Sequence, residues 1–79
     1  MDDRQILERV SVLVAEEHEL ERRAGASGRP VDHARLSEIE VMLDQCWDLL
    51  RQRHARRRAG LDPDEAAFRD PVVVEHYEQ

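Results

Sequence analysis

The fold is decided by one stretch of the chain, Leu36-Ser-Glu-Ile-Glu-Val-Met-Leu-Asp-Gln-Cys-Trp-Asp-Leu-Leu50. Its apolar residues recur every three or four positions, which is the spacing of one face of an α-helix. They form two interleaved seams, Leu36, Leu43, Trp47 and Leu50 in one and Ile39, Met42, Cys46 and Leu49 in the other. Together the seams span an arc of roughly 160°, which is wider than one neighbouring helix covers. A second packing partner is therefore expected on this helix.

The preceding segment predicts the first of these partners. A helix of about 3–24, capped by Asp2 or Asp3, carries one apolar stripe roughly 140° wide. The stripe consists of Ile6, Leu7, Val10, Leu13, Val14, Leu20 and Ala24. Gly25 suits the left-handed position that ends a helix.

A loop of 25–30 leads to the second helix, which we expect at about 31–59. Pro30 suits the first turn of this helix and Asp32 is the alternative cap, while Gly60 ends it. So short a loop forces the two helices into an antiparallel hairpin that resembles a coiled coil.

The register of the hairpin follows from matching the two apolar patterns. Residue numbers that sum to about 56 place apolar residues opposite each other. The pairs are Leu20 with Leu36, Leu13 with Leu43, Val10 with Cys46, and Ile6 and Leu7 near Leu49 and Leu50. The same register brings Glu21 to Arg35 and Asp3 to Arg53.

The tail, residues 60–79, is predicted to be partly helical. Asp62-Pro63-Asp64-Glu65 supplies an N-cap, a proline at the first helical position and a glutamate at the third. Asp70-Pro71 opens a further segment, 72–77, that suits a helix or a strand equally. The wide face of the second helix is covered either by this tail or by a second copy of the hairpin. A core this thin rarely suffices alone, so we expect a homodimer that forms a four-helix bundle.

Length and composition agree with a single all-α domain over residues 1–79. The chain is 41% hydrophobic, 38% charged and only 4% aromatic, which excludes a disordered chain and argues against a small β-barrel. A net charge of −6 argues against a dedicated binder of nucleic acid or anionic membranes. No signal sequence and no apolar run approaching 18 residues are evident, so we expect a cytoplasmic protein without a membrane segment.

The sequence offers little catalytic chemistry. Glu16-Glu17-His18-Glu19 lacks the Glu-x-x-His spacing of helical di-iron sites, and its acids are expected to face Arg35. Cys46 is the only cysteine, lies on the predicted buried face and has no histidine within helical reach, so it is interpreted as a core residue. Phosphate loops, nucleophile elbows and Cys-x-x-Cys pairs do not occur. We expect no enzymatic activity, no cofactor and no metal.

Five arginines lie in the stretch Arg51-Gln-Arg53-His54-Ala-Arg56-Arg57-Arg58. Steps of 100° spread them around the helix, so that Arg53 and Arg57 approach Asp3 while the other three point to water. We expect an interaction or scaffold module that associates with itself or with an unidentified protein. Its predicted contact residues are Met42, Trp47, Leu49, Arg51, Arg56 and Arg58. The alternative is an accessory factor that binds nucleic acid or a nucleoprotein assembly through Arg51–Arg58.

Three stretches carry a resemblance to a known family. They are Glu16-Glu-His-Glu-Leu20, Asp44-Gln-Cys-Trp-Asp-Leu-Leu-Arg-Gln-Arg53, and Ala59-Gly60 followed by Asp62-Pro-Asp-Glu-Ala66. In these the chain resembles small actinobacterial proteins that are grouped as a domain of unknown function. The likeness spans nearly the whole chain, and Asp-Gln-Cys-Trp-Asp-Leu-Leu-Arg is its most specific part. It implies one domain throughout and no particular activity, substrate or cofactor.

Overall fold

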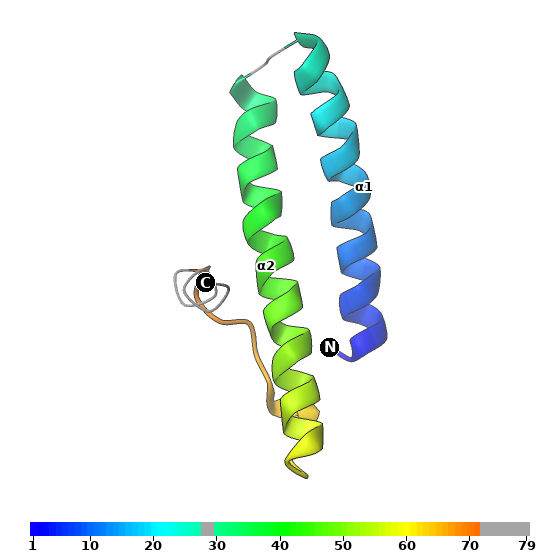
Figure 1. The fold of residues 1–79 in the computed structure, drawn as a ribbon, viewed down its shortest axis with the longest axis vertical. Coiled ribbons are helices and arrows are strands. Elements are labelled where there is room, and N and C mark those ends of the chain that lie inside the picture. The colour runs from blue at the N-terminus through cyan, green and yellow to red at the C-terminus, as the bar shows by residue number, and fades with distance from the viewer. Residues whose placement is uncertain (28–29, 72–79) are drawn as a thin grey trace.

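Two long antiparallel helices make up most of the computed structural model, which describes residues 1–27 and 30–71. Helix α1 (Asp3–Ser27) and helix α2 (Pro30–Arg58) lie side by side, and a single-turn 3-10 helix, η1 (Pro63–Glu65), follows them (Figure 1). The described residues contain no strand. The all-α antiparallel hairpin predicted from the sequence is confirmed.

Helix α1 begins with a reciprocal cap. The backbone N–H of Gln5 donates to Asp2 Oδ1 at 2.8 Å, and the backbone N–H of Asp2 donates to Gln5 Oε1 at 2.9 Å. Each side chain satisfies a backbone donor that the first helical turn leaves without a helical acceptor. Because Asp2 serves as the cap, the neighbouring Asp3 carboxylate is available for contact with α2.

The first helix is longer than predicted because it continues through Gly25 to Ser27. Among the described residues only Gly60 has a positive φ, so the prediction that a left-handed Gly25 ends the helix was wrong. Gly25 has alanine on both sides, and alanine is the strongest helix former, which offsets the roughly 1 kcal/mol that an internal glycine costs. Helix α2 starts at Pro30, one residue before the predicted start.

The far end of α2 is closed as the sequence predicts. Gly60 has a φ of 76°, and its N–H donates to the Arg57 carbonyl at 3.1 Å. The next N–H, that of Leu61, reaches back to the Arg56 carbonyl at 2.8 Å, which completes a Schellman motif. The chain then turns back along α2 (Figure 1).

The predicted turn at the start of the tail is confirmed. Asp62 Oδ1 accepts a hydrogen bond from the Asp64 N–H at 2.9 Å, and Pro63 opens the 3-10 helix. The segment 72–77, for which helix and strand were equally suited, lies outside the described residues.

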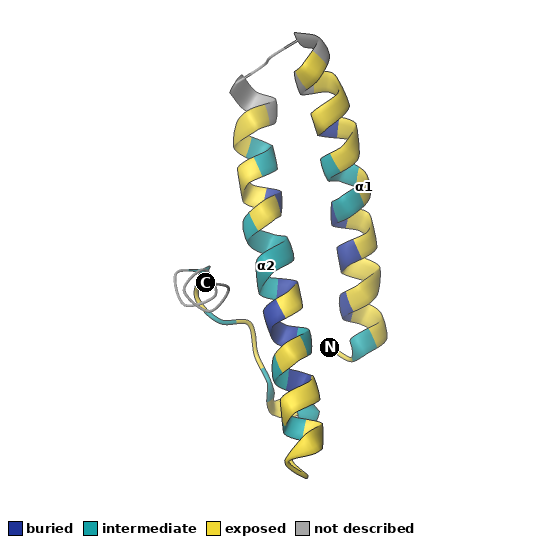
Figure 2. Ribbon diagram, viewed as in Figure 1, coloured by how far each residue is buried: buried dark blue, intermediate teal, exposed yellow. Residues whose placement is uncertain are grey.

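The core lies along the contact between the two helices (Figure 2). Its buried apolar residues are Ile6, Val10, Leu13 and Leu20 of α1 and Ile39, Cys46 and Leu49 of α2. Helix α1 therefore covers the seam of α2 that contains Cys46. The other seam stays partly open: Leu36, Leu43 and Leu50 are half-buried and Trp47 is 43% exposed. The molecule measures 50 × 25 × 15 Å, so the hairpin is one layer thick with two broad sides.

The predicted register is confirmed at one end of the hairpin and corrected at the other. Arg53 Nε lies 2.5 Å from Asp3 Oδ1, as predicted. Near the loop, however, Arg35 binds Glu16 with Nε 2.6 Å from Oε2, while Glu21 is exposed. The prediction of a Glu21–Arg35 pair was therefore wrong, and Arg35 instead binds one of the acids of Glu16-Glu17-His18-Glu19 that were expected to face it.

Candidate interaction surface

On α2, the buried residues that face α1 have a surface on each side, and these two surfaces differ in their contacts. The tail face consists of Gln45, Asp48, Gln52, Arg53 and Arg56, which hold residues 62–69. The Trp47 face consists of Glu40, Leu43, Asp44, Trp47, Leu50, Arg51 and His54. At 100° per residue, Gln45 and Trp47 point roughly 160° apart around the helix axis. The described part of the tail therefore lies away from Trp47, although Arg51 at the edge of the Trp47 face lines a hollow together with Arg69 of the tail.

Asp48 anchors the tail and has no exposed surface at all. Arg69 binds both of its carboxylate oxygens, with Nε 2.9 Å from Oδ2 and Nη2 on Oδ1. Gln52 Nε2 donates to the same Oδ2 at 2.9 Å. The Arg69 guanidinium holds the pKa of Asp48 below its usual range, with a smaller contribution from Gln52. A buried carboxylate is thus fully paired with a residue of the tail.

Helix α2 also binds the backbone of the tail. Gln45 Nε2 donates to the Arg69 carbonyl at 3.1 Å, and Gln52 Nε2 donates to the Ala67 carbonyl at 2.8 Å. Nearer η1, Arg53 Nη1 donates to the Pro63 carbonyl at 3.1 Å, and Arg56 Nε donates to the Asp62 carbonyl at 2.6 Å. These side chains satisfy carbonyl groups of an irregular segment, which fixes its path along the helix.

Arg53, Arg56 and Arg57 of the arginine cluster bind acids of the described chain. Arg53, only 5% exposed, binds Asp3 and also Asp64, with Nη1 2.9 Å from Oδ1. Arg57 Nη2 lies 2.6 Å from Asp3 Oδ2, which confirms the prediction that Arg53 and Arg57 approach Asp3. Hydrogen bonds from Arg57 and then Arg53 lower the pKa of Asp3 from 3.8 to about 2.

Arg56 is the third of these arginines. Its Nη2 lies 2.7 Å from Glu65 Oε2, so the prediction that Arg56 points to water was wrong. The tail supplies this acid, and the helical pattern alone does not place the tail. Arg51 and Arg58 are exposed, as predicted.

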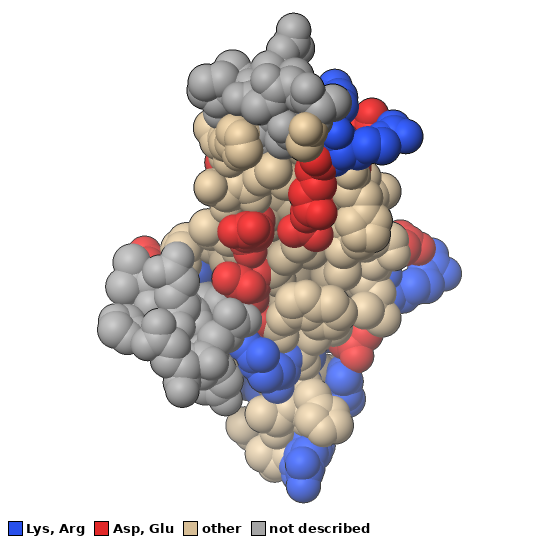
Figure 3. Space-filling view, turned by 45° about the horizontal axis from the view of Figure 1, so that its top comes forward, with Lys and Arg blue, Asp and Glu red and all other residues tan. Residues whose placement is uncertain are grey.

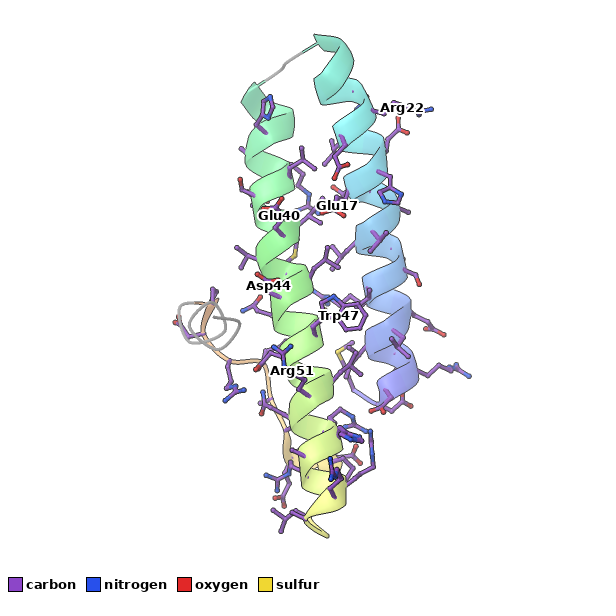
Figure 4. The ribbon with its side chains drawn as sticks, in the orientation of Figure 1. Glu17, Arg22, Glu40, Asp44, Trp47 and Arg51 are labelled. Carbon is purple, nitrogen blue, oxygen red and sulfur yellow. The ribbon has the colours of Figure 1, made fainter. Side chains whose placement is uncertain are left out.

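The Trp47 face presents an aromatic side chain beside an open hollow. The hollow has a volume of about 480 Å³ and is lined by Trp47, Leu50, Arg51 and His54. Figure 4 shows the Trp47 side chain projecting from α2 toward α1, the helix that carries Glu17. Within the described chain, no residue accepts a hydrogen bond from the indole N–H. A large apolar side chain with an unused donor is typical of contact surfaces.

The charges on the Trp47 face are separated by sign along the helix. Glu40 and Asp44 lie on the loop side of Trp47, and Arg51 lies on the other side (Figure 4). Figure 3 shows acidic side chains running down the middle of this side of the molecule, with arginines below them. Neither Glu40 nor Asp44 forms an ion pair with any residue that the structure describes.

Residues 2–79 match the family described as "Protein of unknown function (DUF2630)". The chain belongs to this family. Similar proteins are the "Uncharacterized protein Rv0898c" of Mycobacterium tuberculosis and the "Uncharacterized protein Mb0922c" of Mycobacterium bovis, each 46% identical over 77 residues. That span covers 95% of this chain and 88% of each relative. No solved structure matches this DUF2630 chain.

The structure places the contact residues predicted for the DUF2630 chain in three different environments. Leu49 is 3% exposed and belongs to the core, and Met42 packs against that core. Arg56 holds the tail, so Trp47, Arg51 and Arg58 remain exposed. The Trp47 face also contains five residues outside that prediction: Glu40, Leu43, Asp44, Leu50 and His54. Two of them, Leu43 and Leu50, were already visible as members of the Trp47 seam.

Other chemistry is sparse in the DUF2630 chain. Cys46 is 1% exposed, and this burial raises the pKa of its thiol, which keeps the sulfur protonated and poorly nucleophilic. Within residues 1–27 and 30–71, no three or more His, Cys, Asp or Glu side chains gather to hold a metal ion. In the same part of the chain, no helix combines the length and apolarity needed to cross a membrane.

Proposed function

We propose that this protein is a cytoplasmic, non-enzymatic interaction module that binds a protein surface through its Trp47 face. The observation that carries the proposal is the exposure of Trp47 at the centre of a half-buried apolar seam, beside a hollow of about 480 Å³. Tryptophan is enriched among the residues that dominate binding energy at protein interfaces. The tail supports this assignment because its described part packs on the other side of α2.

Site-specific photo-crosslinking in cells tests the proposal. A photoreactive residue at His54, which borders the hollow, is expected to give discrete cross-linked protein bands. The matched control carries the same residue at Glu8, an exposed α1 position that forms an ion pair with Arg4 one turn away. Equal labelling from both positions, or none from His54, would contradict the proposed function.

The alternative function, nucleic-acid binding through Arg51–Arg58, has weaker support. Arg53, Arg56 and Arg57 already bind acids of the same chain, so their charges are largely neutralised locally. The net charge of −6 on the whole chain also opposes binding to phosphates. We expect no submicromolar binding to duplex DNA or single-stranded RNA at about 150 mM salt.

Fluorescence anisotropy with labelled oligonucleotides decides between the two functions. Tight binding that is lost in the double variant Arg51→Glu and Arg58→Glu would favour the nucleic-acid function. Retained folding of that variant, measured by circular dichroism, is the necessary control.

A further inference from the structure

Acidic and basic residue types lie at matched distances on opposite sides of Trp47 along α2. Glu40 and Asp44 precede Trp47 by seven and three residues, and Arg51 and His54 follow it by four and seven. At 100° per residue, all five side chains lie within an arc of roughly 80°. One stripe of α2 therefore carries an acidic half and a basic half, with the indole between them.

Such a stripe is complementary to itself when a second stripe runs in the opposite direction. Consider an axis of two-fold symmetry near Trp47. A residue that precedes Trp47 in one copy then lies opposite the residue that follows Trp47 by about the same number of positions in the second copy. Asp44 then faces Arg51 of the second copy, Glu40 faces His54, and each pair occurs twice. A parallel arrangement would place like charges together, which is unfavourable.

We propose that the occupant of the Trp47 face is a second copy of this chain, packed antiparallel about a two-fold axis near Trp47. This inference rests on the proposed function and names the partner of the same surface. The two hairpins form a four-helix bundle in which the two Trp47 side chains meet at the centre. Each indole then lies near the hollow lined by Leu50, Arg51 and His54 of the other copy.

The apolar residues support the same arrangement. Leu43 and Leu50 are half-buried in the single hairpin and lie four residues before and three residues after Trp47. A two-fold axis brings the four copies of these leucines around the two indoles. Among its described residues the single hairpin buries a core of seven apolar side chains, and a chain of this size gains from a further layer.

The proposed dimer requires the positive charge of Arg51 at this position, and it is compatible with contacts between Arg51 and other residues of the same chain. Its positive charge also acts on Asp48 of the same helix. A guanidinium has five N–H donors, so one contact within the chain leaves others for a carboxylate of the second copy.

The first measurement is the mass of the full chain by sedimentation equilibrium from about 5 to 500 μM. We expect a reversible approach to twice the chain mass of 9.2 kDa. A wild-type chain that stays monomeric over this range overturns the inference. The photo-crosslinking at His54 then decides separately whether the proposed function survives with a different protein as partner.

The second measurement tests the register with two charge reversals. Asp44→Arg leaves two arginines facing each other across the axis, and Arg51→Asp leaves two aspartates, so each variant alone should dimerise at least tenfold more weakly. Mixed in equal amounts, the two variants form a dimer in which the arginine introduced at position 44 faces the aspartate introduced at position 51. In the same dimer the native Asp44 of one variant faces the native Arg51 of the other. We expect the mixture to regain a dimer mass close to that of the wild type.

The controls carry the same charge changes outside the Trp47 face. Glu8→Arg and Arg22→Asp alter exposed α1 residues and should leave the dimer constant within about twofold of the wild type. Dimers that persist in both Trp47-face variants, or a mixture that stays monomeric, would overturn the register. A chain ending at residue 71 tests the tail as occupant: dimerisation only after this truncation would show that residues 72–79 cover the face in the full chain.

Discussion

The tail face and the Trp47 face belong to the same helix but differ in what contacts them. On the tail face, a buried acid and two glutamines bind an irregular segment through side-chain hydrogen bonds. On the Trp47 face, half-buried leucines surround an exposed tryptophan, and the nearby acids Glu40 and Asp44 have no ion pair within the described chain. The described tail covers one face, whereas the other is the surface that we propose binds a second molecule.

On α2, therefore, the positions of the apolar residues and the positions of the buried residues do not coincide. Asp48 is fully buried although it is charged, while Trp47 beside it is 43% exposed. The tail explains the first observation because Arg69 neutralises the carboxylate where the tail covers it. Burial on this helix therefore follows the positions of α1 and the tail more closely than residue type.

The largest expected difference between the faces comes from two adjacent leucines. Leu49 is 3% exposed in the core, whereas Leu50 is half-buried on the Trp47 face. Leu49→Ala should lower the free energy of unfolding by about 3 kcal/mol, and Leu50→Ala by only about 1 kcal/mol. Urea titrations followed by circular dichroism measure both values.

The comparison requires chain concentrations low enough that association adds nothing to stability. At higher concentrations the cost of Leu50→Ala should grow, because the proposed dimer buries this side chain. Equal costs for the two variants at all concentrations would contradict the difference between the faces.

The sequence alone predicts the hairpin but not which seam of α2 its first helix covers. Both seams carry four apolar residues at helical spacing, so periodicity ranks them equally. Helix ends that depend only on neighbouring residues are predicted correctly: Gly60 ends α2, and Asp62 caps η1. The contact between Asp48 and Arg69 spans 21 residues and depends on the path of an irregular tail, which no periodic pattern encodes.

The second prediction compares two aspartates one turn apart on α2. Asp48→Ala removes the acceptor of Arg69 and Gln52 and should cost about 2 kcal/mol, since charge-assisted hydrogen bonds are lost at a buried position. Asp44→Ala on the Trp47 face should change stability by less than about 0.5 kcal/mol at low chain concentration.

Urea unfolding gives both values, and limited proteolysis after residue 61 reports whether Asp48→Ala releases the tail. A tail that stays protected in Asp48→Ala would show that the backbone hydrogen bonds of Gln45 and Gln52 suffice to hold it.

The third prediction concerns stability in acid. The folded chain lowers the pKa of Asp3 from 3.8 to about 2, and that of Asp48 is lowered as well. Both contributions are complete above about pH 4 and are lost as the pH falls toward the folded pKa values, because the unfolded chain takes up protons first. The free energy of unfolding should therefore decline between about pH 4 and about pH 2.

Urea titrations across this pH range measure the decline, and Asp48→Asn should make it shallower. Asp44→Asn is the matched control at low chain concentration, because Asp44 has no ion pair within the described chain. A slope that is the same in Asp48→Asn as in the wild type would contradict the role of the Arg69 contact.

The smallest expected effect distinguishes two glutamates near the loop. Arg35 binds Glu16 through two hydrogen bonds, from Nε to Oε2 at 2.6 Å and from Nη2 to Oε1 at 3.0 Å, and this contact lowers the pKa of Glu16. A double-mutant cycle of Glu16→Gln and Arg35→Gln should therefore give a favourable coupling. The coupling should be small, because both side chains are more than a third exposed to screening water.

The matched cycle of Glu21→Gln with Arg35→Gln should give no coupling, although Glu21 carries the same charge on the same helix. Urea unfolding at low ionic strength gives the best resolution, and added salt should shrink the Glu16 coupling. If Glu21 coupled to Arg35 and Glu16 did not, the guanidinium would bind the acid that the register places opposite it. The Asp3–Arg53 contact fixes the register at the far end, so that result would change the path of one side chain and leave the helix pairing intact.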